Sequence, residues 1–346
     1  MNKLTKVGFS ALCGSLAAIS NANAGDLTVT GGVDMTWISL SQDVTGNPIG
    51  IGSNLTFKGS GELDNGWTFD MGIAHKNGNA YSAAYVDLTM GGLGTINIDQ
   101  GDSGNGICAY DDKMPTAWEE AWGAGLSTHV KLACGAGSAM NIQYATPTVL
   151  GTTIQLAYAP KMGATDTADK GTGAGTVGSG RGYDAVININ PSLGTEILSG
   201  LNVYAGGHYT EKNVGNTLED LWSGVAGATM DIGPISLGIG VAGEATGQET
   251  TATEVTAYKS NMFGIAFNVN DDLSLSYSEY DTRKAGFVHS SGYIAPGKRM
   301  VEVESWQIAY TIGGASIRIA EVEGTNLGFT SGNNKEATVV SVGLAF

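Results

Sequence analysis

The last eight residues of the sequence, residues 339–346 (VVSVGLAF), alternate between two kinds of side chain up to the final phenylalanine. The large apolar set is Val340, Val342, Leu344 and Phe346. The set between them, mostly small or polar, is Val339, Ser341, Gly343 and Ala345. A period of two is the spacing of a β-strand with one apolar face. Chain ends are usually frayed and polar. An alternating pattern that continues to the last residue therefore predicts that the C-terminal residue belongs to a β-sheet.

The same alternation recurs along the chain in about sixteen strand-like segments. The clearest of them are residues 67–74, 140–145, 153–158, 201–208, 235–244, 273–280 and 315–321. Segments near 220–230 and 300–306 lose the alternation, and we expect β-bulges or shifted strand boundaries there.

The connections between these segments fall into a short and a long class, and the two classes alternate. The short connections read as hairpin turns and cover 64–66, 91–94, 148–151, 192–200, 233–234, 270–272 and 313–314. The long, polar connections cover about 40–50, 101–136, 160–182, 211–219, 245–253, 282–300 and 325–334. The turn at 76–79 is short where the alternation requires a long loop.

Short turns at one end and long loops at the other describe an antiparallel up-and-down β-barrel. In a bilayer such a sheet has to close, because an open edge would leave backbone groups without hydrogen-bond partners. We therefore predict an all-β transmembrane barrel of about 16 strands with an apolar outer face. The last strand pairs with the first, residues 26–39, and places Phe346 on the lipid-facing surface. An ordinary secreted β-sandwich is the alternative, but sandwiches seldom separate loop lengths in this way.

Residues 1–24 have the features of a cleaved signal peptide: two lysines, an apolar run and small residues before the cleavage site. The expected mature chain, residues 25–346, is one barrel domain. It carries 15 basic and 33 acidic side chains, a net charge of −18. This negative charge argues against a nucleic-acid partner, because nucleic acids bind to basic patches. It is compatible with a preference for cations.

Two cysteines, Cys108 and Cys134, remain after removal of the signal peptide. In an exported protein, two cysteines favour one disulfide between them. The pair brackets most of the longest connection, so we expect a bond that stiffens this loop.

On these features the sequence resembles the general porins of Gram-negative bacterial outer membranes. The resemblance rests on the signal peptide, the strand number, the terminal GLAF and the long third loop, and it covers essentially the mature chain. It implies a homotrimer embedded in outer-membrane lipid that passes small polar solutes and ions by passive diffusion. It also implies that Phe346 is read by the barrel-assembly machinery, and that the third loop, residues 101–137, folds into the lumen as the constriction.

Within this loop, four carboxylates are the candidate acidic side of the pore: Asp111, Asp112, Glu119 and Glu120. Trp118 and Trp122 lie four residues apart, so a short helix could stack them on one side. We interpret them as anchors that pack the loop on the wall. Rings of carboxylates favour cations, whereas lysine and arginine favour anions.

The resemblance implies a basic cluster on the opposite wall. Strand alternation directs Lys58 and Arg318 into the lumen, which is otherwise expected to be lined by Thr, Ser, Asn, Asp and Gly. The sequence contains only four arginines, so a dense arginine cluster cannot form. We therefore expect a modest preference for cations.

Other chemistry finds little support. A Gly-x-Gly-x-x-Gly pattern at 238–243 lies inside an alternating strand rather than before a helix, so it does not indicate dinucleotide binding. The four histidines have no metal-ligand spacing, and no catalytic triad is recognisable. We expect neither enzymatic activity nor a cofactor, with Ca²⁺ on the acidic loops as a minor alternative.

Two other functions remain open on the sequence. One is a substrate-specific channel of the same fold, with Tyr110, Trp118 and Trp122 as its sorting surface. The other is a barrel that acts as an enzyme or an adhesin.

Overall fold

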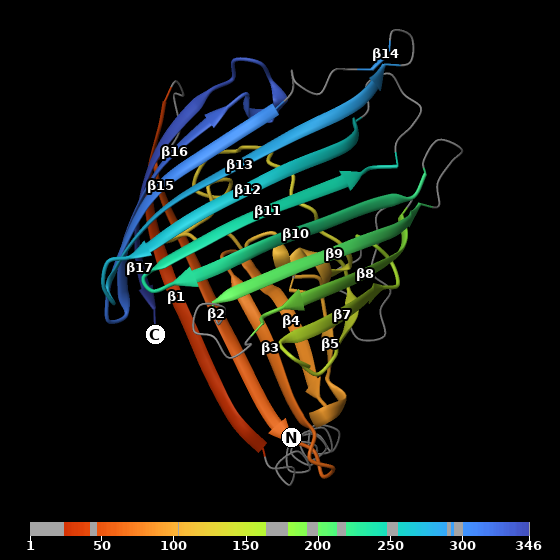
Figure 1. The fold of residues 1–346 in the computed structure, drawn as a ribbon. Helices are drawn as coiled ribbons and strands as arrows, with labels where there is room; N and C mark the ends of the chain where they lie inside the picture. Colours follow the sequence, from red (N-terminus) through yellow and green to blue (C-terminus); the bar gives the residue numbers. More distant parts are fainter. Residues whose placement is uncertain are drawn as a thin grey trace, which may run out of the picture.

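A computed structural model describes residues 24–41, 47–102, 104–163, 179–191, 200–212, 219–247, 255–288, 292–293 and 300–345. This part of the chain forms one antiparallel sheet that closes on itself (Figure 1). Sixteen strands make the barrel, as the alternation predicts, and β14 is a two-residue strand paired with β13 alone. No helix in the described ranges is long and apolar enough to cross a membrane.

The strands follow one another around the barrel in chain order. In the first half they are β1 (Ala24–Leu40), β2 (Ile49–Glu62), β3 (Thr68–Lys76), β4 (Asn79–Thr89), β5 (Thr95–Asp99), β6 (Asn141–Ala145), β7 (Thr152–Ala159) and β8 (Ser179–Ile189). In the second half they are β9 (Leu201–Lys212), β10 (Leu221–Ile232), β11 (Ile235–Ala245), β12 (Val255–Asn268), β13 (Leu273–Val288), β14 (Gly292–Tyr293), β15 (Met300–Ile312), β16 (Ala315–Thr325) and β17 (Lys335–Ala345).

The barrel closes between its first and last strands, as predicted. β1 pairs antiparallel with β17 over residues 32–40, with Trp37 opposite Val340 and Asp34 opposite Gly343. β1 also pairs with β2, so neither of its edges is left open. Phe346 itself lies outside the described residues.

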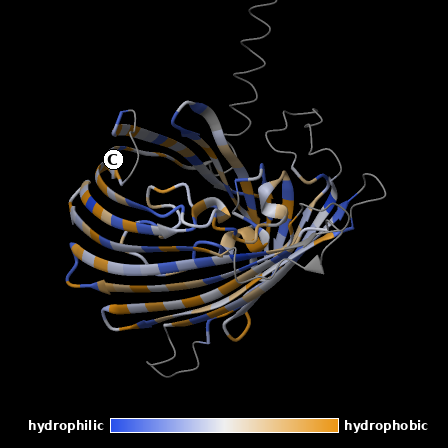
Figure 2. Cartoon of the chain, turned by 90° about the horizontal axis from the view of Figure 1, so that it is seen from above, coloured by the Kyte–Doolittle hydropathy of each residue, from blue (hydrophilic) through white to orange (hydrophobic). Residues whose placement is uncertain are grey.

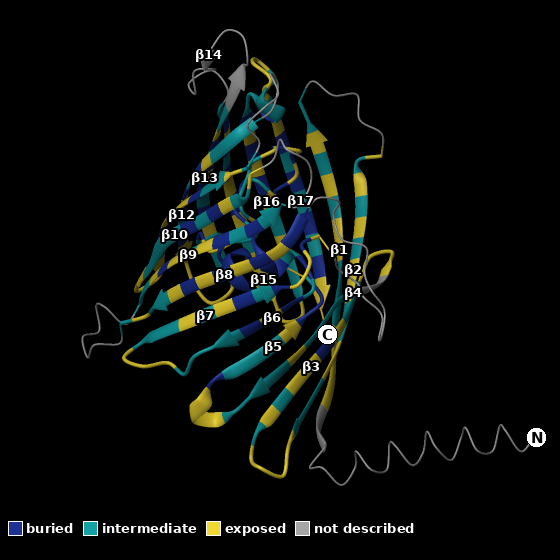
Figure 3. Ribbon diagram, turned by 90° about the vertical axis from the view of Figure 1, so that its right-hand side faces the viewer, coloured by how far each residue is buried: buried dark blue, intermediate teal, exposed yellow. Residues whose placement is uncertain are grey.

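The apolar face of the alternation lies on the outside of the barrel. Along the strands, hydrophobic and hydrophilic residues alternate visibly (Figure 2), as do exposed and buried ones (Figure 3). Ile239 is 62% exposed and Ile317 50% exposed, and both are on this outer face. Four aromatic rings form a row across adjacent strands near the long-loop end: Tyr158, Tyr183, Tyr209 and Trp222. Such a row is typical of the aromatic girdle at a membrane interface.

The segments near 220–230 and 300–306 are regular strands, so the expectation of bulges there was wrong. β10 and β15 pair with both neighbours without a register shift. The alternation fails in the sequence because Val225, Val301 and Val303 are apolar yet point inward, where they are at most 4% exposed. The inner wall is therefore apolar in part, which differs from the uniformly polar lumen expected from the sequence.

We predict that Ile239→Arg lowers the free energy of unfolding by about 2–4 kcal/mol, because a charge near the middle of the lipid-facing band is costly. Unfolding by urea in lipid vesicles, followed by tryptophan fluorescence, measures the change. Ser236→Arg on the inner face of the same strand is the control and should cost little. Equal costs at the two positions would contradict the assignment of the outer face.

Candidate functional site: a loop held inside the barrel

The segment between β5 and β6, residues 100–140, folds into the barrel interior, where it crosses behind β10–β13 in Figure 1. It contains two short 3-10 helices, η2 (Gly106–Tyr110) and η3 (Ala136–Ser138). The short helix expected around Trp118 and Trp122 is not present, since this stretch consists of bends and turns. The reason is that the loop backbone bonds to the barrel wall here instead of to itself.

Apolar packing attaches one side of the loop to the inner wall. Ile107, Tyr110 and Met114 are at most 4% exposed and belong to the same buried cluster as the inward valines of β15. Trp118 and Trp122 pack against this cluster and are only partly buried. The inward apolar residues of the wall are thus buried in one cluster with the loop and with Leu327 of the connection between β16 and β17.

Polar side chains of the wall satisfy the loop backbone. The Ser276 hydroxyl accepts the N–H of Ala117 at 2.8 Å, and the Ser278 hydroxyl accepts that of Ala121 at 3.1 Å. Gln307 accepts the N–H of Glu119 at 3.0 Å and donates to the carbonyl of the same residue at 2.5 Å. Buried backbone groups need such partners. Part of the serine and glutamine complement of the lumen therefore holds the loop and does not line the passage.

A disulfide joins Cys108 and Cys134 at the two stems of the loop, with their Cα atoms 4.3 Å apart. The N–H of Gly135 points to the Cys108 sulfur at 3.1 Å. The bond links η2 to the segment that precedes η3, and it closes the loop at its base.

The four loop carboxylates differ in exposure. Asp112 and Glu119 are exposed inside the barrel, whereas Asp111 and Glu120 are partly buried. Desolvation raises the pKa of Asp111 to about 6, and the neighbouring charge of Asp112 adds to this effect. Desolvation also raises the pKa of Glu120 to about 7, again with repulsion from nearby acids. Two of the four carboxylates therefore titrate close to neutral pH.

Glu119 combines exposure with a raised pKa. Desolvation by the surrounding protein atoms is the main cause, although its side chain is open to the passage. The charges of Arg318 and Lys76 oppose the shift, while that of Asp34 adds to it. Glu119 thus lies within electrostatic reach of the wall.

Arg318 points inward, as the alternation predicts, but its surroundings differ from the expected basic cluster. Its guanidinium pairs with Asp34 of β1 and bonds to Ser341 of β17 at 3.0 Å. It also lies over the Trp118 ring, 5.0 Å from the ring centroid, a cation–π distance. Arg318 is therefore largely neutralised and adjoins the loop instead of facing it across the pore.

Lys58 lines an inner recess of about 510 Å³ together with Thr28, Tyr85 and two acids, Asp70 and Asp87. The two acids are directly opposite each other on β3 and β4. In the register of the sheet, Lys58 pairs with Thr28 of β1. Arg318 pairs with Ser341 of β17, which in turn pairs with Thr36 of β1. Eight residues of β1, about 26 Å at 3.3 Å per residue, separate these two positions, so the two cations do not form one cluster.

The sequence analysis did not single out Asp34, Asp70, Lys76 and Asp87 as site residues of the lumen. Each occupies a position that strand alternation could have assigned to the inner face, but no local motif distinguishes it. It also missed Asp184 and His208, which lie beside the loop stems. Within the described ranges, no group of three or more His, Cys, Asp or Glu side chains could hold a metal ion.

The sequence pattern of one family, described as Gram-negative porin, matches residues 9–345. A search of curated protein sequences finds no significant match. Among solved structures, OmpF of Salmonella typhi in complex with daunomycin aligns at 13% identity over 93% of this chain and 98% of its own, with a TM-score of 0.65. The anion-selective porin of Comamonas acidovorans aligns at 14% identity over 93% and 99%, with a TM-score of 0.62.

The trimer form of OmpT from Vibrio cholerae aligns at 10% identity over 94% of this chain and 100% of its own, with a TM-score of 0.61. At these identities the structural matches establish the fold, whereas the family pattern spans nearly the whole sequence. The chain therefore belongs to the Gram-negative porin family of non-enzymatic outer-membrane β-barrel channels.

Proposed function

We propose that the protein forms a water-filled channel for passive diffusion of small hydrophilic solutes and ions, with a modest preference for cations. The loop of residues 101–137 is its constriction. The supporting observation is the exposure of Asp112 and Glu119 inside the barrel. Fixed charges act strongly in a narrow passage with low-dielectric walls, and exposed carboxylates attract cations.

Among the cations of the described wall, Lys76 partly offsets the charge of Glu119, whereas Arg318 and Lys58 are offset by acids of the wall itself. Arg318 is paired with Asp34, and Lys58 shares its recess with Asp70 and Asp87. The loop's own Lys113 lies 3.5 Å from Asp112 and compensates only one carboxylate. The Comamonas acidovorans porin is described as anion-selective, so the fold alone does not set selectivity, and the argument rests on these side chains.

The packing of Tyr110, Trp118 and Trp122 favours a general channel over the substrate-specific alternative. Tyr110 is 4% exposed and its hydroxyl bonds to Gln155 on the wall at 3.2 Å. Trp118 and Trp122 pack against the buried cluster. We propose that the tryptophans anchor the loop and do not stack on passing solutes.

We predict that Asp112→Asn combined with Glu119→Gln lowers the cation-to-anion permeability ratio roughly twofold, because both carboxylates contribute to the potential of the passage. The reversal potential of single channels in a KCl gradient measures this ratio. Glu323→Gln removes one charge from the outer face and should leave the ratio unchanged. Anion preference in the unmodified channel would refute the proposed selectivity.

We predict that cation preference also depends on pH. Asp111 and Glu120 have raised pKa values of about 6 and about 7, so they are charged above these values and neutral below them. Reversal potentials recorded from pH 8 to pH 5 should show preference falling as the pH drops through 7 and 6. Glu120→Gln should remove the step near pH 7. A profile that is flat over this range would contradict the assignment.

We further propose that the protein is a homotrimer in outer-membrane lipid, and that Phe346 is a signal for the barrel-assembly machinery. The Vibrio cholerae neighbour described as a trimer form supports the first point. Native mass spectrometry of the detergent-extracted protein should give the mass of three chains. A monomer mass under conditions that preserve channel activity would contradict the trimer.

A further inference from the structure

We propose that Asp184 is a positioning residue that fixes both stems of the constriction loop to the barrel wall and thereby sets a steady pore width. The inference rests on the proposed function of this loop as the constriction. Asp184 lies on the inner face of β8, and its side chain is fully buried. Neither loop stem lies near it in the sequence.

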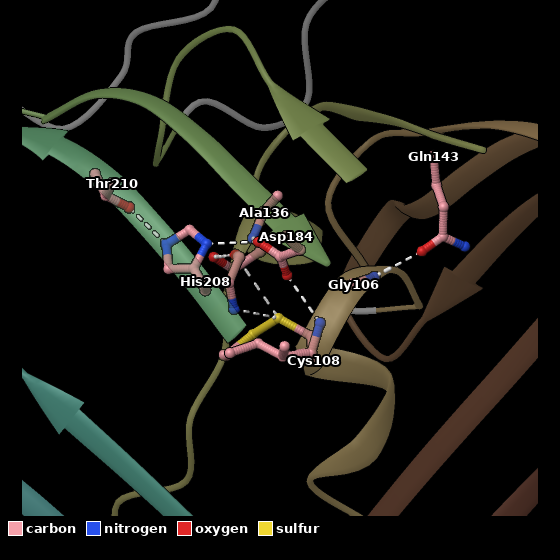
Figure 4. A network of polar contacts seen from close by, with 11 residues as sticks. Gly106, Cys108, Ala136, Gln143, Asp184, His208 and Thr210 are labelled. Carbon is pink, nitrogen blue, oxygen red and sulfur yellow. Dashed lines mark hydrogen bonds and ion pairs between the residues drawn. A yellow bond between two sulfur atoms is a disulfide. The ribbon is translucent and has the colours of Figure 1, made fainter. Parts of the chain in front are cut away.

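The Asp184 carboxylate accepts one backbone hydrogen bond from each stem (Figure 4). The N–H of Ile107 bonds to Oδ2 at 2.8 Å, and the N–H of Ala136 bonds to Oδ1 at 2.9 Å. Ile107 precedes Cys108, and Ala136 is two residues beyond Cys134. One side chain of the wall therefore holds the loop at both of its ends.

Two glycines allow this close approach. A Cβ atom on Gly106 or on Gly135 would fall well inside contact distance of the Asp184 carboxylate. Gly106 also has a φ of +61°, a backbone conformation that side chains disfavour. The loop sequence is thus adapted to receive this carboxylate at both stems.

His208 of β9 holds the carboxylate from behind. Its Nδ1 lies 2.5 Å from Oδ1 of Asp184, and its Nε2 lies 2.6 Å from the Thr210 hydroxyl. With Nδ1 donating to the carboxylate, a neutral ring leaves Nε2 to accept the Thr210 proton. This chain of bonds orients the carboxylate toward the loop, in the way that outer partners orient a ligand side chain.

The disulfide and Asp184 do different work. The disulfide joins the stems to each other, whereas Asp184 joins each stem to the wall. With the disulfide removed, the carboxylate still holds both stems side by side. With the carboxylate removed, the disulfide keeps the stems together but no longer fixes them to β8. With both lost, the bond from the Gly106 N–H to Gln143 of β6 still holds the first stem, but the second stem is no longer fixed to β8, so the two losses should be strongly non-additive.

Single-channel recording of four proteins tests the inference: unmodified, Asp184→Asn, Cys108→Ser with Cys134→Ser, and the combination. The isosteric amide retains one acceptor oxygen and loses the charge, so Asp184→Asn should keep nearly the original conductance with added open-channel noise. The disulfide-free protein should remain steady. The combination should fluctuate between conductance levels, because the base of the loop can then move while Ser276, Ser278 and Gln307 still hold its middle.

Asp231→Asn is the matched control, because this carboxylate bonds to Ser236 at the β10–β11 turn. It should leave the recordings unchanged with or without the disulfide. A combined variant as steady as the disulfide-free protein would overturn the proposal. Ion preference is read separately, so an anion-preferring channel would refute the proposed selectivity without affecting this result.

Hydrogen exchange gives a second test, and its first part uses only the unmodified protein. The amides of Ile107 and Ala136 should be among the slowest to exchange in the loop, and should stay slow after reduction of the disulfide. Gly135→Ala, whose methyl group displaces one stem, should speed the exchange of Ala136 by at least about tenfold while Gly78→Ala, at an open turn, should not. Rapid exchange of both amides in the unmodified protein would overturn the proposal.

Discussion

The pairing of β1 with β17 is the interaction on which the rest of this structure depends. Inside a bilayer no water is present to satisfy a free strand edge, so the sheet must close before any of its other features can exist. Closure assigns one face of every strand to lipid and the other to the interior. Where the outer face meets lipid it is apolar, as at Ile239 and Ile317. The inner assignment is not strict, because the interior holds both water and protein.

That difference explains why the inner wall is apolar beneath the loop. Val301 and Val303 would be poorly placed facing water, but they are buried in one cluster with the loop and with Leu327. Where the loop is buried against the wall, its backbone N–H and C=O groups need hydrogen-bond partners, as those of a strand in lipid do. Ser276, Ser278 and Gln307 supply them along its length, and Asp184 supplies them at its base. Wall and loop are therefore complementary surfaces of one core.

The repeated strand pattern could be predicted from the sequence, whereas single contacts between the loop and the wall could not. Strand number, loop alternation and the outward face of β17 follow from a period-two pattern that many residues support. The prediction of a short helix near Trp118 was wrong. The spacing of the tryptophans cannot reveal that Gln307, 188 residues distant from Glu119, forms the hydrogen bonds to the Glu119 backbone. The roles of Asp184 and His208 were missed for the same reason. Each is one inward residue on one strand, and its partner is set by folding of the loop rather than by neighbours in the chain.

The strongly acidic composition does not indicate how much negative charge lies inside the pore, because many of the acids are outside the barrel. Four glutamates stand in direct register across β13, β15, β16 and β17: Glu279, Glu304, Glu323 and Glu336. They share the outer face with Trp306, which is 65% exposed, so their charge lies outside the barrel wall. Solvent and salt screen charges over about 8–10 Å, which limits what these glutamates add to the lumen. The ion preference that we propose therefore rests on carboxylates inside the barrel, and those on the loop depend on the contacts that keep the loop in place.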